Sequence, residues 1–427
     1  MRHVAGNPWD PARVDGGMKR DRRRPACRRH HSLVPRSRNR RKTLGLRHTR
    51  AFVNRVFGMD MHAMRVLSLA NGVAGVLNTA VLSVHGIGQA YARLARTTPK
   101  AGVKQVDRTL SNDGIEVNAV MRRWAQYVVG THPSVVVALD WTDFDDDDHT
   151  TLCAYLVTTH GRAMPIAWKT VKKSRLAEHR TATELALIET LHTWLPASVG
   201  VTLLADRGFG SQVLYENLVM LGWDFVIRFR ECILVECDGA QKPAGDWLLP
   251  TGRARKLAAA KVTADRTEVG AVVIAKAAKM KDAWCLATSL RALTASQVVK
   301  LYGRRFTIEE TFRDTKDLHF GMGLRATHIR NADRRDRLLL LVAMAHTLLT
   351  LLGAASEASG LDRYLKVNTV KRRTLSLYRQ GLYWYECIPD MREDWLRRLM
   401  TAYDEIVRSH AFFSTFFAHP GPIDAGR

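Results

Sequence analysis

The middle of the chain alternates between apolar segments of strand length and amphipathic segments of helix length. Three short apolar segments separated by polar turns come first and predict antiparallel strands. A helical period, a fourth apolar segment and a second helical period follow. This order is typical of an α/β protein with a central sheet. The strands are expected at residues 135–144, 151–158, 163–171 and 201–205, and the helices at residues 181–195 and 212–221.

A segment rich in short strands comes next. Residues 226–230, 270–275 and 283–289 are apolar and lie between polar loops that contain Gly and Pro. We expect a β-rich segment at about residues 225–290.

Two predicted helices nearer the start form a candidate DNA-binding element. The spacing predicts helices at residues 84–95 and 100–110, with Thr98 as an N-cap and Pro99 in the first turn of the second helix. One face of the second helix is apolar, and the other is basic through Lys100, Lys104 and Arg108. Two short helices joined by a tight turn suit a helix-turn-helix reader of DNA ends. An ordinary surface helix of a basic protein is the alternative.

An apolar run at residues 338–355 is long enough to be considered as a membrane span. His346, Thr347 and Thr350 interrupt the run, and charged residues flank it. These interruptions favour a helix buried against the sheet, so we expect no membrane insertion.

The charge of the chain points to a polyanionic partner. The formal net charge is +24 over 427 residues, which indicates either nucleic acid or an anionic membrane surface. Residues 1–50 hold sixteen Lys and Arg against three Asp and have almost no apolar period, so residues 1–58 are expected to be a disordered basic extension. The extension is either a non-specific DNA-binding arm or translated upstream sequence before a natural start at Met59, Met61 or Met64.

The cysteines and the N-terminus predict the compartment. None of the six cysteines forms a C-x-x-C pair, so neither a zinc site nor a disulfide framework is indicated. No apolar signal-peptide core follows a short basic region. We therefore expect a protein of a reducing cytoplasm.

The most informative polar pattern lies at residues 302–316. Four side chains there are three, four and seven residues apart, which places them on one face of a helix at about 100° per residue. They are Tyr302, Arg305, Glu309 and Lys316. A carboxylate framed by two cations and a phenol suits a phosphate held beside a metal ion. A solvated helix with ion pairs between its turns is the alternative.

Two of the predicted buried strands deliver an aspartate. Asp140 and Asp206 each follow an apolar run. Carboxylates at the ends of adjacent central strands can converge with a carboxylate on a helix packed across them. We expect Asp143 to support this site. The acidic turn at residues 145–148 is expected to be a solvated hairpin tip, because a mobile loop does not hold carboxylates at ligand geometry.

Together these motifs resemble the DDE transposases of the insertion-sequence 4 family. Asp140, Asp206 and Glu309 match the metal-binding triad of that family in chain order. Residues 302–316 match its Tyr-Arg-Glu-Lys signature at every spacing. The similarity extends over about residues 83–381.

The resemblance implies an α/β fold in four parts. It predicts a ribonuclease H-like catalytic core with an all-β insertion, preceded by a helical N-terminal DNA-binding domain and followed by C-terminal helices. The expected parts are the basic extension at residues 1–58, a DNA-end-binding domain at residues 59–130, the catalytic domain at residues 131–330 and a C-terminal helical region at residues 331–427.

The resemblance also implies roles for single residues. The three acids would hold two Mg²⁺ or Mn²⁺ ions. Tyr302, Arg305 and Lys316 match DNA phosphate-binding residues, and Arg207, next to the second aspartate, is a further candidate for a phosphate contact. Trp284 resembles a family tryptophan that stacks on a base turned out of the DNA end; packing in the core of the insertion is the alternative.

The implied activity is cut-and-paste transposition, with nicking at the element's end, a hairpin intermediate and joining to target DNA. The implied partner is double-stranded DNA, and the pairing of two element ends implies a homodimer. The implied location of the protein is the bacterial cytoplasm, in association with the nucleoid. The alternatives are a metal-dependent DNA nuclease without strand transfer, an inactive DNA-binding regulator derived from a transposase, and a peripheral membrane protein.

Overall fold

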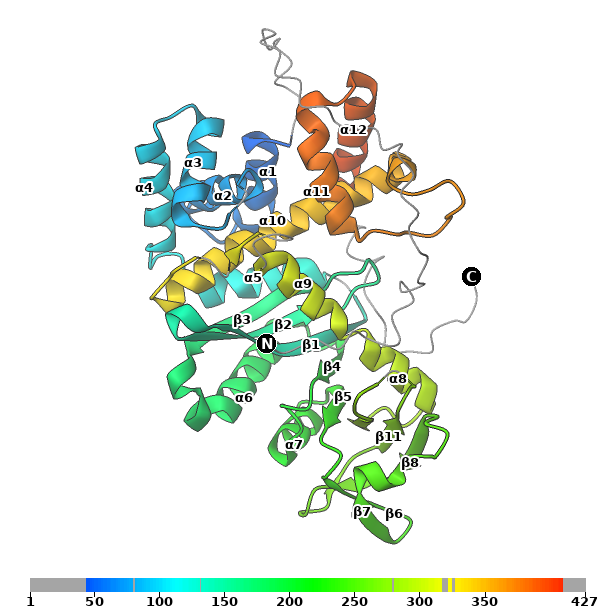
Figure 1. The fold of residues 1–427 in the computed structure, drawn as a ribbon. Helices are drawn as coiled ribbons and strands as arrows, with labels where there is room; N and C mark the ends of the chain where they lie inside the picture. Colours follow the sequence, from blue (N-terminus) through cyan, green and yellow to red (C-terminus); the bar gives the residue numbers. More distant parts are fainter. Residues whose placement is uncertain are drawn as a thin grey trace.

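A large sheet lies at the centre of the protein, with most helices above it, α6 and α7 below it, and a small β-rich lobe at its far end (Figure 1). This arrangement comes from a computed structural model, which describes residues 44–409 except 80, 131, 279, 317–321, 325 and 326. Residues 1–43 of the predicted extension and residues 410–427 of the predicted C-terminal region lie outside the described residues.

The sheet has the strand order β3-β2-β1-β4-β5-β12-β11-β8. β1, β2 and β3 form an antiparallel meander, whereas β4 and β5 follow on the other side of β1 and run parallel to it. The predicted order of strands and helices is therefore confirmed. The bounds are β1 (Ser134–Phe144), β2 (His149–Leu156), β3 (Met164–Lys172), α6 (Leu176–Trp194), β4 (Gly200–Ala205), α7 (Gln212–Met220) and β5 (Asp224–Phe229).

The segment predicted as an all-β insertion continues this sheet. β12 pairs antiparallel with β5, so the backbone groups at the free edge of β5 find partners in the insertion. β11 and β8 extend the sheet further, and four short strands form a second sheet in the order β10-β9-β6-β7. The strands are β6 (Leu234–Cys237), β7 (Ala240–Pro243), β8 (Arg255–Ala258), β9 (Lys261–Val262), β10 (Thr267–Glu268), β11 (Ala271–Ala275) and β12 (Trp284–Thr288).

Five helices precede the sheet, and the first of them differs from the prediction. Residues up to 58 were expected to be disordered, but Leu46–Phe57 form helix α1. Four apolar side chains at helical spacing are buried against the neighbouring helices, and the surrounding arginines obscured this period in the sequence. They are Phe52, Val53, Val56 and Phe57. The others are α2 (Ala63–Leu77), α3 (Val84–Ala95), α4 (Pro99–Leu110) and α5 (Val117–Val129), and Thr98 caps α4 as predicted.

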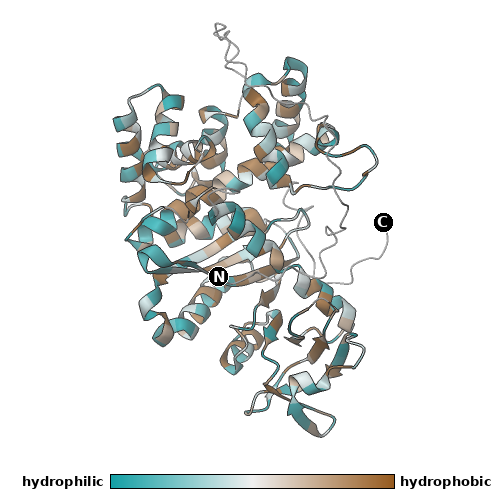
Figure 2. Cartoon of the chain, viewed as in Figure 1, coloured by the Kyte–Doolittle hydropathy of each residue, from teal (hydrophilic) through white to brown (hydrophobic). Residues whose placement is uncertain are grey.

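The apolar run at residues 338–355 lies inside α10 (Ala332–Ala358), the central helix of the protein. Among the described helices it alone is long and apolar enough to cross a membrane, and its most apolar window is fully buried within the protein. Figure 2 shows apolar residues along α10 and the inner strands. The prediction of a buried helix is therefore confirmed. The remaining helices are α8 (Ala295–Gly303), α9 (Phe306–Lys316), α11 (Leu377–Cys387) and α12 (Glu393–Ser409).

The first two turns of α10 tie the helical domain to the sheet. Arg334 donates to Asp107 of α4 at 2.7 Å, and Arg337 donates to the carbonyl oxygen of Leu110 at 3.0 Å. Arg335 reaches the other way and pairs with Asp147 in the acidic turn.

The acidic turn was expected to be solvated, and for Asp147 this is wrong. Its side chain is 5 % exposed. It pairs with Arg335 and accepts a hydrogen bond from the Ile329 amide at 2.8 Å. Hydrogen bonds and an opposite charge therefore satisfy this carboxylate inside the protein.

Asp336 of α10 is expected to make stability fall as the pH rises. Burial, offset in part by hydrogen bonding from Thr170 of β3, raises the pKa of its carboxyl to about 7. The folded chain therefore holds this proton more tightly than the unfolded chain, and the free energy of unfolding falls between about pH 4 and pH 7. This fall in the free energy of unfolding is about 4 kcal/mol at most, and we expect it to be absent in Asp336→Asn.

Urea denaturation at low and neutral pH checks this expectation. The exposed Asp265, between the short strands β9 and β10, provides the control, because Asp265→Asn should keep the pH dependence of the wild type. An Asp336→Asn variant with an unchanged pH dependence would contradict the assignment.

Candidate active site

Two aspartates lie at adjacent positions on neighbouring parallel strands. In the register of β1 and β4, Leu139 pairs with Ala205, so the next residues along the two strands are Asp140 and Asp206. The Gly208 amide donates to Asp206 Oδ1 at 2.8 Å and orients this carboxylate. β1 continues to Phe144, but its parallel pairing with β4 ends at Leu139 and Ala205, so both acids lie at the carboxyl end of the parallel part of the sheet, where ligands of open α/β sheets bind.

The helix predicted at residues 302–316 is broken into two helices, and Arg305 lies in the turn between α8 and α9. Its guanidinium donates from Nη1 to Asp140 Oδ2 at 3.0 Å and from Nη2 to Glu309 Oε1 at 2.5 Å. The Arg305 side chain is only 6 % exposed. One buried arginine therefore joins the strand acid to the helix acid.

The charges of these residues influence one another. Burial raises the pKa of Asp140 to about 6; Arg305 counteracts this shift, whereas Asp206 and Glu309 add to it. Burial opposes the charge of Arg305, but the surrounding acids and Tyr302 raise its pKa above the ordinary value. All three predicted acids therefore act on the same small region, and one guanidinium offsets only part of their negative charge.

Lys316 crosses from α9 to β1. Its Nζ donates to Thr142 Oγ1 at 3.1 Å and to the Asp143 carbonyl oxygen at 2.5 Å, and it lies 4.7 Å from the centre of the Phe144 ring. The Asp143 carboxylate accepts hydrogen bonds from Thr150 at 2.7 Å and from Lys173 at 2.8 Å. The contacts of Lys316 fasten the helix that carries Glu309 to the strand that carries Asp140.

Tyr302 and Trp284 pack together next to this group. Tyr302 is 1 % exposed and Trp284 is 4 % exposed. Their rings meet edge to face at 4.9 Å, and Trp284 also stacks on Phe306 at 5.9 Å. Burial raises the pKa of Tyr302. The position of Trp284 in this structure is that of a packed core residue, which was the alternative to base stacking. A DNA base can reach its ring only after Tyr302 or Phe306 moves.

The other predicted DNA contacts are exposed. Arg207 is 57 % exposed and lies 3.7 Å from Asp282. The three basic residues of α4 are exposed on the helical domain, and α4 packs on α2, α3 and α10 rather than on the acids. They are Lys100, Lys104 and Arg108.

Two residues of α6 that sequence reasoning missed lie beside the aspartates. Glu184 is 4 % exposed and accepts hydrogen bonds from Trp141 Nε1 at 2.7 Å and from Arg180 Nε at 3.0 Å. Burial raises the pKa of Glu184, and Asp206 contributes to the rise. The only sequence signal is an Arg and a Glu four residues apart, which is common on surface helices.

Three carboxylates are a donor set suited to Mg²⁺ or Mn²⁺, which prefer oxygen ligands. Within the described part of the chain, however, no three His, Cys, Asp or Glu side chains lie close enough together to hold a metal ion. Arg305 lies between two of the acids and supplies the positive charge there. The three carboxylates therefore suit a divalent ion as ligands. An ion can bind between Asp140 and Glu309 only if Arg305 moves.

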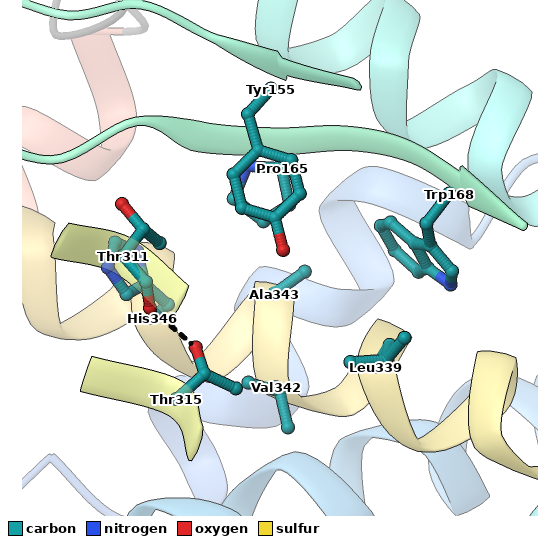
Figure 3. A pocket seen from close by; sticks show the side chains of 9 residues that line it. All are labelled: Tyr155, Pro165, Trp168, Thr311, Thr315, Leu339, Val342, Ala343 and His346. Atoms are coloured by element: carbon teal, nitrogen blue, oxygen red, sulfur yellow. Dashed lines mark hydrogen bonds between the residues drawn. The ribbon is translucent and has the colours of Figure 1, made fainter. Parts of the chain in front are cut away.

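A small cavity lies on the other side of α9, between β2, β3 and α10 (Figure 3). It holds about 10 Å³, which is room for about one water molecule. The Thr315 hydroxyl donates to the Thr311 carbonyl oxygen at 3.0 Å on its wall. The cavity is too small for a nucleotide, so the acids at the sheet edge are the candidate active site. Its lining residues are Tyr155, Pro165, Trp168, Thr311, Thr315, Leu339, Val342, Ala343 and His346.

Comparison with known families agrees with this location. A family model described as "Transposase DDE domain" matches residues 132–348, just over half of the chain. The match begins before β1 and ends within α10, so it contains all three acids and Arg305. No curated protein matches the chain. The acids at the sheet edge and the extent of this match lead to one conclusion: the chain belongs to the transposase DDE-domain family.

Proposed function

We propose that this protein is the cut-and-paste transposase of an insertion sequence of the insertion-sequence 4 type. The observation that carries the proposal is the linkage of Asp140 and Glu309 through Arg305, with Asp206 at the adjacent strand end. The strand order β3-β2-β1-β4-β5, with β4 and β5 parallel to β1, supports a ribonuclease H-like core.

The three acids would hold two divalent ions, and Mg²⁺ or Mn²⁺ suits their oxygen donors. When bound, these ions supply the Lewis acid that activates the attacking oxygen and stabilises the leaving oxygen of a phosphodiester. Arg305, released from Asp140, would bind a non-bridging phosphate oxygen. Lys316 would hold α9 against β1 and contribute a second positive charge, and Tyr302 would donate to a nearby phosphate.

The remaining predicted contacts extend this proposal along the DNA. Arg207 would contact a phosphate beside Asp206, and the exposed basic face of α4 would recognise the element's end through Lys100, Lys104 and Arg108. Trp284 would stack on a displaced base once its aromatic neighbours move. The net charge of +24 suits double-stranded DNA in a bacterial cytoplasm. Pairing of two ends would use a homodimer.

The proposal is tested with DNA that carries the inverted repeats flanking the gene. Incubation with Mg²⁺ is expected to yield both cleaved ends and products joined to target DNA. Cleavage without joined products would indicate a nuclease. Binding to the repeats without cleavage would indicate a DNA-binding regulator.

Arg305 is expected to compete with divalent ions for Asp140 and Glu309. Arg305→Ala removes a guanidinium that makes two charge-assisted hydrogen bonds, each worth about 1.5–3 kcal/mol. We therefore expect Mn²⁺ to bind the variant at least about tenfold more tightly than the wild type. Isothermal titration calorimetry without DNA measures this affinity directly.

The matched control is Arg313→Ala. Arg313 pairs with Glu310 on the same helix and is 56 % exposed, so its removal leaves the three acids as they are. A wild-type Mn²⁺ affinity in Arg305→Ala would show that the arginine does not occupy the position of an ion.

A further inference from the structure

A half-exposed arginine lies beside Asp206 without pairing with it. Arg180 of α6 is 42 % exposed, and its Nε donates to Glu184 Oε1 at 3.0 Å. Among the described residues, Glu184 is its only hydrogen-bonding and ion-pairing partner. The four N–H groups on Nη1 and Nη2 are therefore available to a ligand, because a guanidinium has five donors in total.

Two aromatic rings hold this guanidinium in place. The Arg180 Cζ atom lies 5.8 Å from the centre of the Trp141 ring and 5.8 Å from the centre of the Phe209 ring. Trp141 directly follows Asp140, and Phe209 comes three residues after Asp206. The same buried Glu184 that binds Arg180 also accepts the indole N–H of Trp141 at 2.7 Å. The arginine is thus preorganised by residues that adjoin both aspartates.

A glycine lets the guanidinium and the second aspartate approach the same point of the backbone. A β-carbon at Gly208 would lie 3.0 Å from Arg180 Nη2 and 3.1 Å from Asp206 Oδ1. The positive and the negative group therefore lie close to the same residue, just after the end of β4. A DNA phosphate that reaches this point would suit both groups, since guanidinium binds phosphate through paired N–H donors while a carboxylate shares a metal ion with it.

We propose that Arg180 is a DNA phosphate-binding residue of the active site, held in position by Glu184, Trp141 and Phe209. The proposal rests on the proposed function in that it takes DNA as the ligand. Arg180 belongs to α6 and is not one of the phosphate-binding residues proposed within residues 302–316. Arg180 would hold a phosphate of the DNA backbone next to Asp206, while Arg305 would bind a phosphate oxygen next to Asp140 and Glu309.

The test measures DNA affinity as a function of salt concentration. A duplex ending in the element's inverted repeat is titrated by fluorescence anisotropy with the full-length wild type, Arg180→Gln, Arg180→Lys and Glu184→Gln. We expect Arg180→Gln to bind about tenfold more weakly and to lower the salt slope by about 0.9, the value of one lost phosphate contact. Arg180→Lys keeps the charge and should keep the slope. Glu184→Gln should bind at least as tightly as the wild type, because glutamine keeps an oxygen that accepts the Arg180 Nε–H and leaves the donors on Nη1 and Nη2 available to phosphate.

The control is Arg397→Gln on α12, which removes one exposed arginine elsewhere. A wild-type affinity and slope in Arg180→Gln would overturn the proposal. So would equal losses of affinity in Arg180→Gln and Glu184→Gln, since a merely structural ion pair predicts that result. The same samples are assayed for joined products: a wild type that binds but joins nothing contradicts the proposed function, while the salt slopes still decide the role of Arg180.

Discussion

Replacing Glu309 with glutamine is expected to lower the rate of DNA cleavage and joining by roughly 10³-fold or more, while DNA binding is retained. Glutamine has nearly the same shape and can still accept the hydrogen bond that Arg305 donates to Oε1 at 2.5 Å. What it removes is the negative charge that would share a divalent ion with Asp140 and Asp206. The expected loss therefore falls on the chemical step and not on the fold. Gel assays of cleaved and joined products, beside anisotropy for binding, separate the two.

Glu310→Gln is the matched control for this variant. Glu310 is the next residue on α9, but it pairs with Arg313 and lies 3.8 Å from Arg162, on a face away from Asp140. The same loss of one charge there should leave activity near that of the wild type. Cleavage that survives Glu309→Gln, or equal losses in both variants, would remove Glu309 from the active site.

Gly381→Ala is expected to destabilise the protein by about 3 kcal/mol, at the upper end of what an inserted methyl group costs in a packed core. A β-carbon at Gly381 of α11 would lie 1.8 Å from the Leu349 carbonyl oxygen of α10. A β-carbon at the opposing Gly353 would lie 1.8 Å from the Leu377 carbonyl oxygen. Both obstacles are backbone atoms, so no side chain can rotate away and the two helices must separate.

Gly200→Ala provides the comparison in urea denaturation. A β-carbon at Gly200 would meet its nearest atoms at 3.6 Å, which is ordinary contact. Its free energy of unfolding should therefore stay within about 0.5 kcal/mol of the wild type. If Gly381→Ala unfolds at the same urea concentration as Gly200→Ala, the close crossing of α10 and α11 is wrong.

The local pattern of the chain was enough to predict where most elements lie. Continuous apolar runs can be buried on both faces, which is why β1 and β4 were recognisable before any tertiary information. The aspartates that follow these runs were recognisable for the same reason. The period of α1 was missed because arginines surround its few apolar residues, and those residues become informative only when α2 and α5 cover them.

Contacts between distant segments decided how the site is assembled. The sequence by itself determined the residue types, their order and their approximate elements, since these depend on short-range periodicity. Only the tertiary structure decided that β1 and β4 pair with Asp140 and Asp206 in register, that the signature helix breaks at Arg305, and that this arginine lies between two acids. The position of Arg180 was decided in the same way. All of these features depend on strand register and on the packing of helices that are far apart in the sequence. The spacing of residues along the chain does not show which side chains such long-range contacts bring together.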